Sequence, residues 1–221
     1  MYEAFFLLVI LSLIYFVGSR YSHKLDRYHW RLMAFSSGIF ITVLFMDLLP
    51  LTLNATNPFI LLLSGFVIFH LLQRYVYHHK GKIELRLVNR GFLDVAGFFV
   101  DGFLDGMLIL LAFDISVDLA YALFIPIFIH KLLSAIALSH IVSKLKKGVM
   151  LEILLSLSTL MGGALAFLLE IEIAHTYAML AFITGTLTYI IIRDMIPQNR
   201  YAHPFLFLSG VVLTFPILLI L

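Results

Sequence analysis

Eight stretches of mostly apolar residues fill almost the whole sequence, and each is close to the length of a bilayer crossing. A helix of about 20 apolar residues spans a hydrocarbon core roughly 30 Å thick. The chain is 62% hydrophobic and 13% charged, whereas about half of the residues in soluble proteins are apolar. We therefore predict an all-α membrane protein that forms one transmembrane domain over residues 1–221. The predicted spans lie near 3–19, 32–53, 58–77, 92–113, 117–142, 149–170, 173–193 and 203–221.

The basic residues predict the orientation of these spans. Fourteen of the fifteen lysines and arginines lie in the odd-numbered connections, and the even-numbered connections hold only acidic and neutral residues. Cytoplasmic loops carry an excess of lysine and arginine, so the odd connections are expected on the cytoplasmic side and both termini on the other. The first span is expected to be a retained helix in a plasma or cytoplasmic membrane, because no basic segment or cleavage site marks a signal peptide.

An internal repeat relates the second and seventh spans. Gly38, Asp47 and Pro50 recur as Gly185, Asp194 and Pro197, always 147 residues later. The charge pattern places these two spans in opposite directions across the membrane. We therefore predict an inverted repeat, in which spans 1–3 and 6–8 surround spans 4 and 5. Secondary transporters with such repeats bind substrate near the middle of the bilayer. The alternative is an accidental match between two ordinary helix ends.

The two central spans contain a cluster of polar residues where a membrane protein tolerates few. Asp101 and Asp105 are four residues apart and share one helix face, as do His130 and Ser134. Because the two helices run antiparallel, both pairs are expected at the same depth. The chain has no cysteine, so a metal would need oxygen and nitrogen ligands. Carboxylates with an imidazole suit Zn²⁺, Fe²⁺, Mn²⁺ or Co²⁺, with water or a further protein group completing the shell.

Lys131 is the one basic residue that the charge pattern does not explain. It lies in the middle of the fifth predicted span, next to His130. Its ammonium would neutralise one of the aspartates. Two interpretations follow for the cluster: a metal site with a tethered cation beside it, or a structural Asp–Lys pair that orders the two helices and binds nothing.

These residues resemble the ZIP family of divalent-metal transporters, and the resemblance covers spans 2 to 7. The family motif His-Asn-x-x-(Asp/Glu)-Gly is similar to 101–106, in which Asp101 replaces the histidine and Gly102 the asparagine. The motif His-Glu-x-Pro-(Glu/His) keeps only its first residue, His130. The sequences from Asp47 to Pro50 and from Gly185 to Pro197 resemble the family's second and seventh spans most closely.

The resemblance implies a transporter whose metal ligands are Asp101, Asp105 and His130, with Ser134 at the position of a fourth ligand. In the family this centre holds two metals. Lys131 stands where a second-site ligand would be, and the sixth span lacks the family's glutamate at 160–163, which favours one metal. Asp47 would receive the ion outside, and Asp194 would release it inside. A homodimer is implied by the resemblance alone.

The leading functional prediction is a ZIP-like transporter that moves a divalent cation, most simply Zn²⁺, toward the cytoplasm. No enzymatic activity, cofactor or nucleic-acid partner is expected. One alternative is a degenerate relative in which the Lys131 ammonium replaces the metal, acting as a non-transporting sensor or scaffold. Another is a proton-coupled anion transporter with Lys131 as the counter-charge. An intramembrane hydrolase is disfavoured, because no aspartyl-protease motif is present on two helices.

Overall fold

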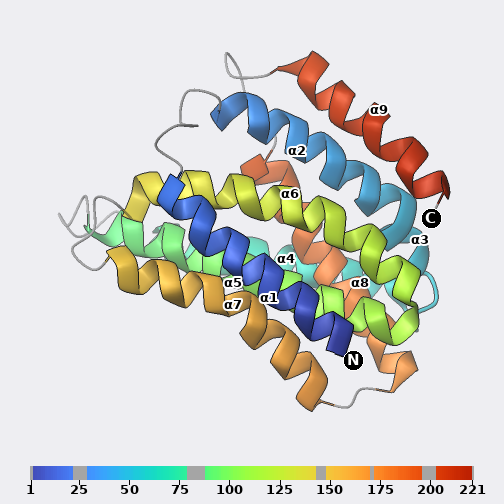
Figure 1. Cartoon of the computed structure of the whole chain (residues 1–221). Coiled ribbons are helices and arrows are strands. Elements are labelled where there is room, and N and C mark those ends of the chain that lie inside the picture. The colour runs from blue at the N-terminus through green and yellow to red at the C-terminus, as the bar shows by residue number, and fades with distance from the viewer. Residues whose placement is uncertain are drawn as a thin grey trace.

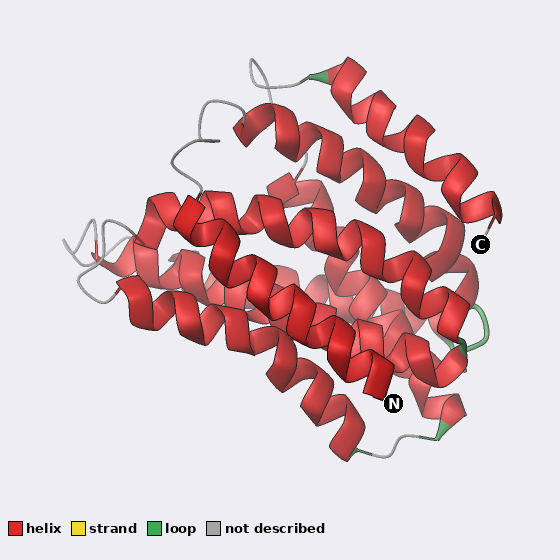
Figure 2. Cartoon of the chain, viewed as in Figure 1, coloured by secondary structure: helices red, strands yellow, loops and turns green. Residues whose placement is uncertain are grey.

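The structure is a computed structural model that describes residues 2–21, 29–78, 88–142, 148–169, 172–195 and 203–220. Almost all of these residues are helical, and none of them forms a strand (Figure 2). The helices are α1 (Tyr2–Tyr21), α2 (His29–Val43), α3 (Leu49–Thr52), α4 (Pro58–His78), α5 (Val88–Ile115), α6 (Val117–Val142), α7 (Gly148–Leu168), α8 (Ile173–Ile190) and α9 (Pro204–Ile220).

The local sequence explains several helix ends. Pro58 and Pro204 occupy the first positions of α4 and α9, where a missing N–H costs nothing. The Ser116 hydroxyl accepts a hydrogen bond of 3.1 Å from the Leu119 N–H and caps α6. Each predicted span coincides with one helical segment, with ends that agree within four residues.

Five helical segments in the described part of the chain are long and apolar enough to cross a membrane. Three further apolar stretches, within α1, α4 and α9, are shorter. The five longer segments are Ala34–Thr52, Val95–Ile115, Val117–Ile136, Gly148–Leu168 and His175–Arg193. The predicted helical class is confirmed, with five segments of a length and composition that suit a membrane, and the count of eight spans stays a prediction.

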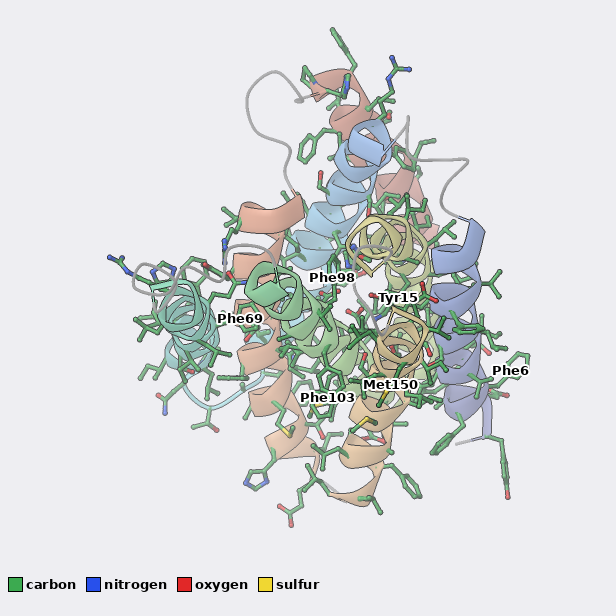
Figure 3. All side chains as sticks on the ribbon, turned by 90° about the vertical axis from the view of Figure 1, so that its left-hand side faces the viewer. Phe6, Tyr15, Phe69, Phe98, Phe103 and Met150 are labelled. Carbon is green, nitrogen blue, oxygen red and sulfur yellow. The ribbon has the colours of Figure 1, made fainter. Side chains whose placement is uncertain are left out.

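The distribution of side chains fits a protein whose solvent is lipid. Large apolar side chains lie on the outside, including Phe59 and Phe205, which are 73% and 87% exposed. Asp101, Asp105 and Lys131 lie inside, and Lys131 is among the largest fully buried side chains. Figure 3 shows the contrast within α1, where Phe6 points outward and Tyr15 points into the bundle.

Two groups of helices make up the fold. The helices α1, α5, α6 and α7 pack against one another, and α2 and α4 pair with α9 and α8 respectively. In Figure 1, α2 and α9 lie side by side along the upper edge, next to α6. The contacts between α2 and α6 and between α5 and α8 join the two groups. Because α5 and α6 contribute both of these contacts, they are the central pair.

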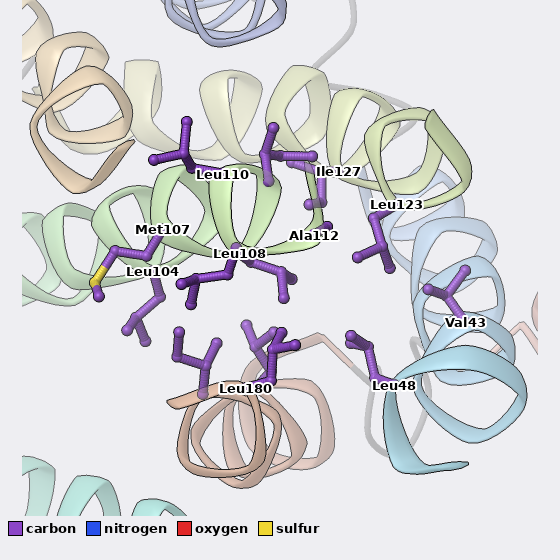
Figure 4. Close-up of a cluster of buried hydrophobic side chains, with 14 of the residues drawn as sticks. Val43, Leu48, Leu104, Met107, Leu108, Leu110, Ala112, Leu123, Ile127 and Leu180 are labelled. Atoms are coloured by element: carbon purple, nitrogen blue, oxygen red, sulfur yellow. The ribbon is translucent and has the colours of Figure 1, made fainter. Parts of the chain in front are cut away.

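The apolar core fills the space between the central pair and the surrounding helices. Leu108 of α5, Leu123 of α6, Leu180 of α8 and Val43 of α2 all point into it (Figure 4). These side chains are almost completely buried. The core therefore fixes one part of α5 and α6, while the polar residues on the same two helices lie outside this apolar cluster.

The α5–α7 contact brings two backbones together. A Cβ atom added to Gly106 would collide with the Thr159 carbonyl oxygen, and one added to Gly162 would collide with that of Phe103. The sequence predicts a close-packing face of small residues on α7; Ser156, Ser158, Gly162, Gly163 and Ala166 are buried, and Ala164 is partly buried. Gly163 lies against Leu8 of α1. This face therefore packs within the chain.

Two π-helical segments interrupt the helical ladders at equivalent places. They cover Leu44–Leu48, between α2 and α3, and Ile191–Met195, after α8. Each residue of the second segment lies 147 positions after its counterpart in the first, which is the offset of the sequence repeat. The apolar pattern of the sequence predicts uninterrupted helices here. A π-helical turn takes up one additional residue and widens the helix locally.

Glycine contacts follow the same correspondence. Gly38 of α2 lies against the Phe207 carbonyl of α9, and Gly185 of α8 lies against the Leu62 carbonyl of α4. The return contacts pair Gly210 with Phe35 and Gly65 with Phe182. The α2–α9 and α8–α4 contacts are therefore built in the same way, each by one glycine from either helix.

Candidate metal centre

The polar cluster predicted from the sequence forms between α5 and α6. The two helices run antiparallel from the short turn at Ser116 and pack along their lengths. Asp101 and Asp105 lie one turn apart on α5, facing His130 and Ser134 of α6. All four side chains are buried, and Asp105 has no exposed surface. The predicted face-sharing and the common depth are therefore confirmed.

His130 joins Asp101 to Ser134. Its Nε2 atom lies 3.1 Å from Asp101 Oδ2 and 3.1 Å from Ser134 Oγ. Two ligands of a tetrahedral Zn²⁺, each about 2.0–2.1 Å from the metal, lie about 3.3 Å apart. Each of the two distances is therefore close to the spacing of adjacent ligands. Binding a metal at Nε2 would replace the proton that the imidazole shares with its two neighbours.

Asp105 pairs with Lys131 and not with His130. The ammonium nitrogen of Lys131 lies 3.1 Å from Asp105 Oδ2, and both side chains are almost completely buried. The second carboxylate oxygen, Oδ1, has no hydrogen-bond partner among the described residues. Buried polar atoms are almost always satisfied in proteins, and this oxygen is available to a further donor or a cation.

Asp101, Asp105 and His130 each direct one ligand atom into the same small volume. These three atoms lie within 4.8 Å of one another, and they form the one such His, Asp and Glu group found in the described ranges. In a tetrahedral shell every pair of ligand atoms is about 3.3 Å apart. Asp105 would therefore have to move inward by on the order of 1.5 Å to complete a three-residue site, to which Ser134 adds a fourth oxygen.

Aromatic rings close two sides of the cluster. The Phe40 ring of α2 meets the His130 imidazole edge to face, with 4.9 Å between centroids. The Tyr15 ring of α1 lies 5.3 Å from the Lys131 nitrogen, a distance at which a cation is attracted to the ring face. Charges in this low-dielectric enclosure interact more strongly than they would in water.

The structure describes the two aspartates predicted to lie on the ion pathway only in part. Asp47 lies in the first π-helical segment, apart from the cluster, half-buried and with Oδ2 unpartnered among the described residues. The backbone of Asp194 lies at the matching position of the second segment, and its side chain is outside the described residues. The structure therefore leaves both pathway roles as predictions.

The residues that enclose Lys131 were not found by the sequence analysis. Tyr15, Gly102 and Ser158 come from three different helices, and each lies next to the ammonium or to the wall around it. A tyrosine or a serine in an apolar helix carries no distinctive signal alone. The glycine at the position of a family asparagine was the one available indication.

No protein-family model matches the chain, and no curated protein matches it. The geometry of the cluster and the internal repeat are therefore what point to a function.

Proposed function

We propose that this protein is a ZIP-like secondary transporter that carries a divalent cation toward the cytoplasm through one site between α5 and α6. The substrate would be Zn²⁺, Fe²⁺, Mn²⁺ or Co²⁺. The observation that carries the proposal is the convergence of Asp101, Asp105 and His130 within 4.8 Å in a buried position. Ionisable residues inside a membrane are costly and commonly mark ion pathways.

The donor set supports a borderline divalent ion. Carboxylate and hydroxyl oxygens with one imidazole nitrogen suit these metals, and the 3.1 Å spacings around His130 are close to those of a tetrahedral shell. The Lys131–Asp105 ion pair also favours a single metal ion, because the ammonium already lies against this carboxylate.

The proposed architecture has eight spans, in which α1 to α4 and α7 to α9 form the two arms of an inverted repeat around α5 and α6. The matching π-helical segments and the exchanged glycine contacts support the repeat. Figure 1 agrees with its direction, since α2 runs toward the right-hand side and α8 returns from it. In such transporters the two arms exchange conformations, so that the central site opens to each side in turn.

Single-cysteine labelling tests this topology, and the natural chain, which has no cysteine, is already the background. Thr56 lies exposed in the turn before α4, which we place outside. Thr56→Cys is expected to react with a membrane-impermeant maleimide in intact cells, whereas Lys146→Cys is expected to react only after the membrane is opened. Equal labelling of both positions in intact cells would contradict the orientation.

Uptake into proteoliposomes tests transport. Asp101→Asn removes the charge next to His130 with little change of shape, so we expect uptake of Zn²⁺ to fall at least tenfold. The matched control is Asp114→Asn, which alters an exposed acid at the far end of the same helix. Uptake by Asp101→Asn equal to that of the natural protein would refute the site. Absence of uptake of all four metals by the natural protein would refute the function.

The Lys131–Asp105 ion pair also favours a second candidate function, that of a ZIP-fold protein that senses or scaffolds without transporting. In this case the ammonium would take the place of the metal. Lys131→Glu separates the two functions. If the variant binds Zn²⁺ in equilibrium dialysis and the natural protein binds none, the non-transporting function is supported. Binding by both proteins supports the transporter.

A further inference from the structure

An apolar groove lies at the junction between the two groups of helices. Its volume is about 910 Å³, and it is lined by Phe103 and Met107 of α5, Phe182 of α8 and Leu61 of α4. Figure 4 shows Leu104 and Met107 at one end of the apolar core, so the groove begins where the core ends. Phe103, Phe182 and Leu61 are only half-buried. The groove is therefore open to the surroundings along part of its length.

The groove follows α8 for nearly the depth of one lipid leaflet. His175, Ala178, Met179, Phe182 and Ile183 line it, and their spacing of three or four residues places them on one helix face. From residue 175 to residue 183 the helix rises by roughly 12 Å. One leaflet is about 15 Å of the roughly 30 Å hydrocarbon core. The groove therefore has the length to hold most of one acyl chain within one leaflet.

A polar pair lies at the end of the groove where α8 begins. Glu172 and His175 line this end, with 3.9 Å between Oε2 and Nδ1, and their side chains are 85% and 73% exposed. The Glu172 side chain makes no capping hydrogen bond to α8, so its carboxylate can accept from another donor. An imidazole N–H can donate to a phosphate, and a carboxylate can accept from an ammonium. The pair therefore complements the two charges of a phosphoethanolamine headgroup.

We propose that this groove is a specific lipid site, which holds one acyl chain of a phosphatidylethanolamine with its headgroup over Glu172 and His175. Bulk lipid is as apolar as the groove. The preference for the groove therefore comes from the close contacts of one chain with three helices and from the headgroup. The chain would touch α5 of one helix group and α4 and α8 of the other, and so would stabilise their junction. Its place in the outer leaflet rests on the topology given under the proposed function.

Native mass spectrometry of the delipidated protein tests the site. Dioleoylphosphatidylethanolamine is expected to give one adduct per chain that saturates before further lipids bind. Ala178→Phe places a ring in the groove, so we expect this adduct to fall at least fivefold. The matched control is Ala96→Phe, which makes the same change at an exposed alanine of α5 and should bind as the natural protein does. Equal binding by the two variants, or no saturable adduct on the natural protein, would refute the site.

The headgroup contact is tested separately. A variant with both Glu172→Ala and His175→Ala keeps the apolar walls, and its half-saturating concentration of dioleoylphosphatidylethanolamine is expected to rise at least threefold. Dioleoylglycerol has the same chains without the headgroup, and we expect it to bind the natural protein and the variant equally. Unchanged binding of phosphatidylethanolamine by the variant would overturn the assignment of the headgroup to this pair.

Fluorescence quenching decides the site if Ala178→Phe does not fold. The chain has one tryptophan, and Trp30→Phe gives a silent background. In this background Phe182→Trp reports on the groove and Phe205→Trp on an exposed face of α9, where the natural side chain is 87% exposed. Phosphatidylethanolamine with brominated chains, added to the protein in detergent, is expected to quench the first to a plateau near one lipid per chain. The second should lose fluorescence gradually with the lipid fraction of the micelle.

Parallel quenching curves at the two positions would refute a specific site. None of these measurements contains a divalent metal. A failure of the lipid site therefore leaves metal transport to be decided by uptake, and absence of uptake leaves the lipid site to be decided by binding.

Discussion

Replacing Gly106 by alanine is expected to destabilise the protein more than any other single methyl addition to α5. A Cβ atom at this position would collide with the Thr159 carbonyl oxygen and would lie 3.0 Å from the Gly163 nitrogen. Both are backbone atoms, so a side-chain rotation cannot relieve the contact. The two helices would have to separate, which would disturb the packing that holds α5 against α7.

The expected loss is about 3 kcal/mol, the upper part of the range for overpacked sites. The loss is followed as a decrease in the midpoint temperature at which monodisperse protein disappears during heating in detergent. The matched control is Gly97→Ala in the same helix, because no atom lies within 4 Å of a Cβ added there. This control should melt at the natural temperature or above, since alanine favours helix over glycine by up to about 1 kcal/mol. Equal melting of the two variants would contradict the described α5–α7 contact.

The second large effect is expected from Asp105→Asn, which removes the charge that faces the Lys131 ammonium. The buried ammonium would then lack its acidic partner, because Asp101, the other acid on the same helix, already pairs with His130. Removing one partner of a buried ion pair typically costs about 3–5 kcal/mol. We expect Asp105→Asn to melt well below the natural protein in the same heating experiment.

A double-mutant cycle separates this pairing from a general effect of the substitution. Lys131→Met in the Asp105→Asn background removes the unpaired ammonium, so the double variant is expected to recover most of the lost stability. The coupling between two contacting residues then appears as a departure from additivity. If the two losses simply add, Lys131 and Asp105 do not act as a pair. Asp114→Asn, at the exposed end of α5, controls for the loss of an acid.

The sequence predicted the helical segments well because the bilayer imposes a simple length rule on them. Each predicted span coincides with a helical segment. The π-helical turns at Leu44–Leu48 and Ile191–Met195 were not predicted, because these spans are apolar on most sides and carry no periodic pattern that an additional residue would shift. The repeated Gly, Asp and Pro positions marked the same two places without revealing the local geometry.

The sequence predicted which residues form the candidate site, but only part of which residue pairs with which. The helical spacing placed Asp101 with Asp105 and His130 with Ser134, and the structure brings these residues together. The spacing left open which acid the ammonium would face. The structure pairs Lys131 with Asp105 and His130 with Asp101, since adjacent residues on one helix point in directions about 100° apart and so reach different turns of α5.

The sequence by itself determined the helical class, the segment boundaries and the residues of the polar cluster. These follow from short-range rules: the length of an apolar run, the charge of a connection and the 3.6-residue helical period. Only the tertiary structure decided that Tyr15, Gly102 and Ser158 surround the Lys131 ammonium, and that Asp105 is its partner. These residues come from α1, α5 and α7, and their meeting depends on how closely the helices approach. That approach is set by glycine contacts between backbones far apart in the chain.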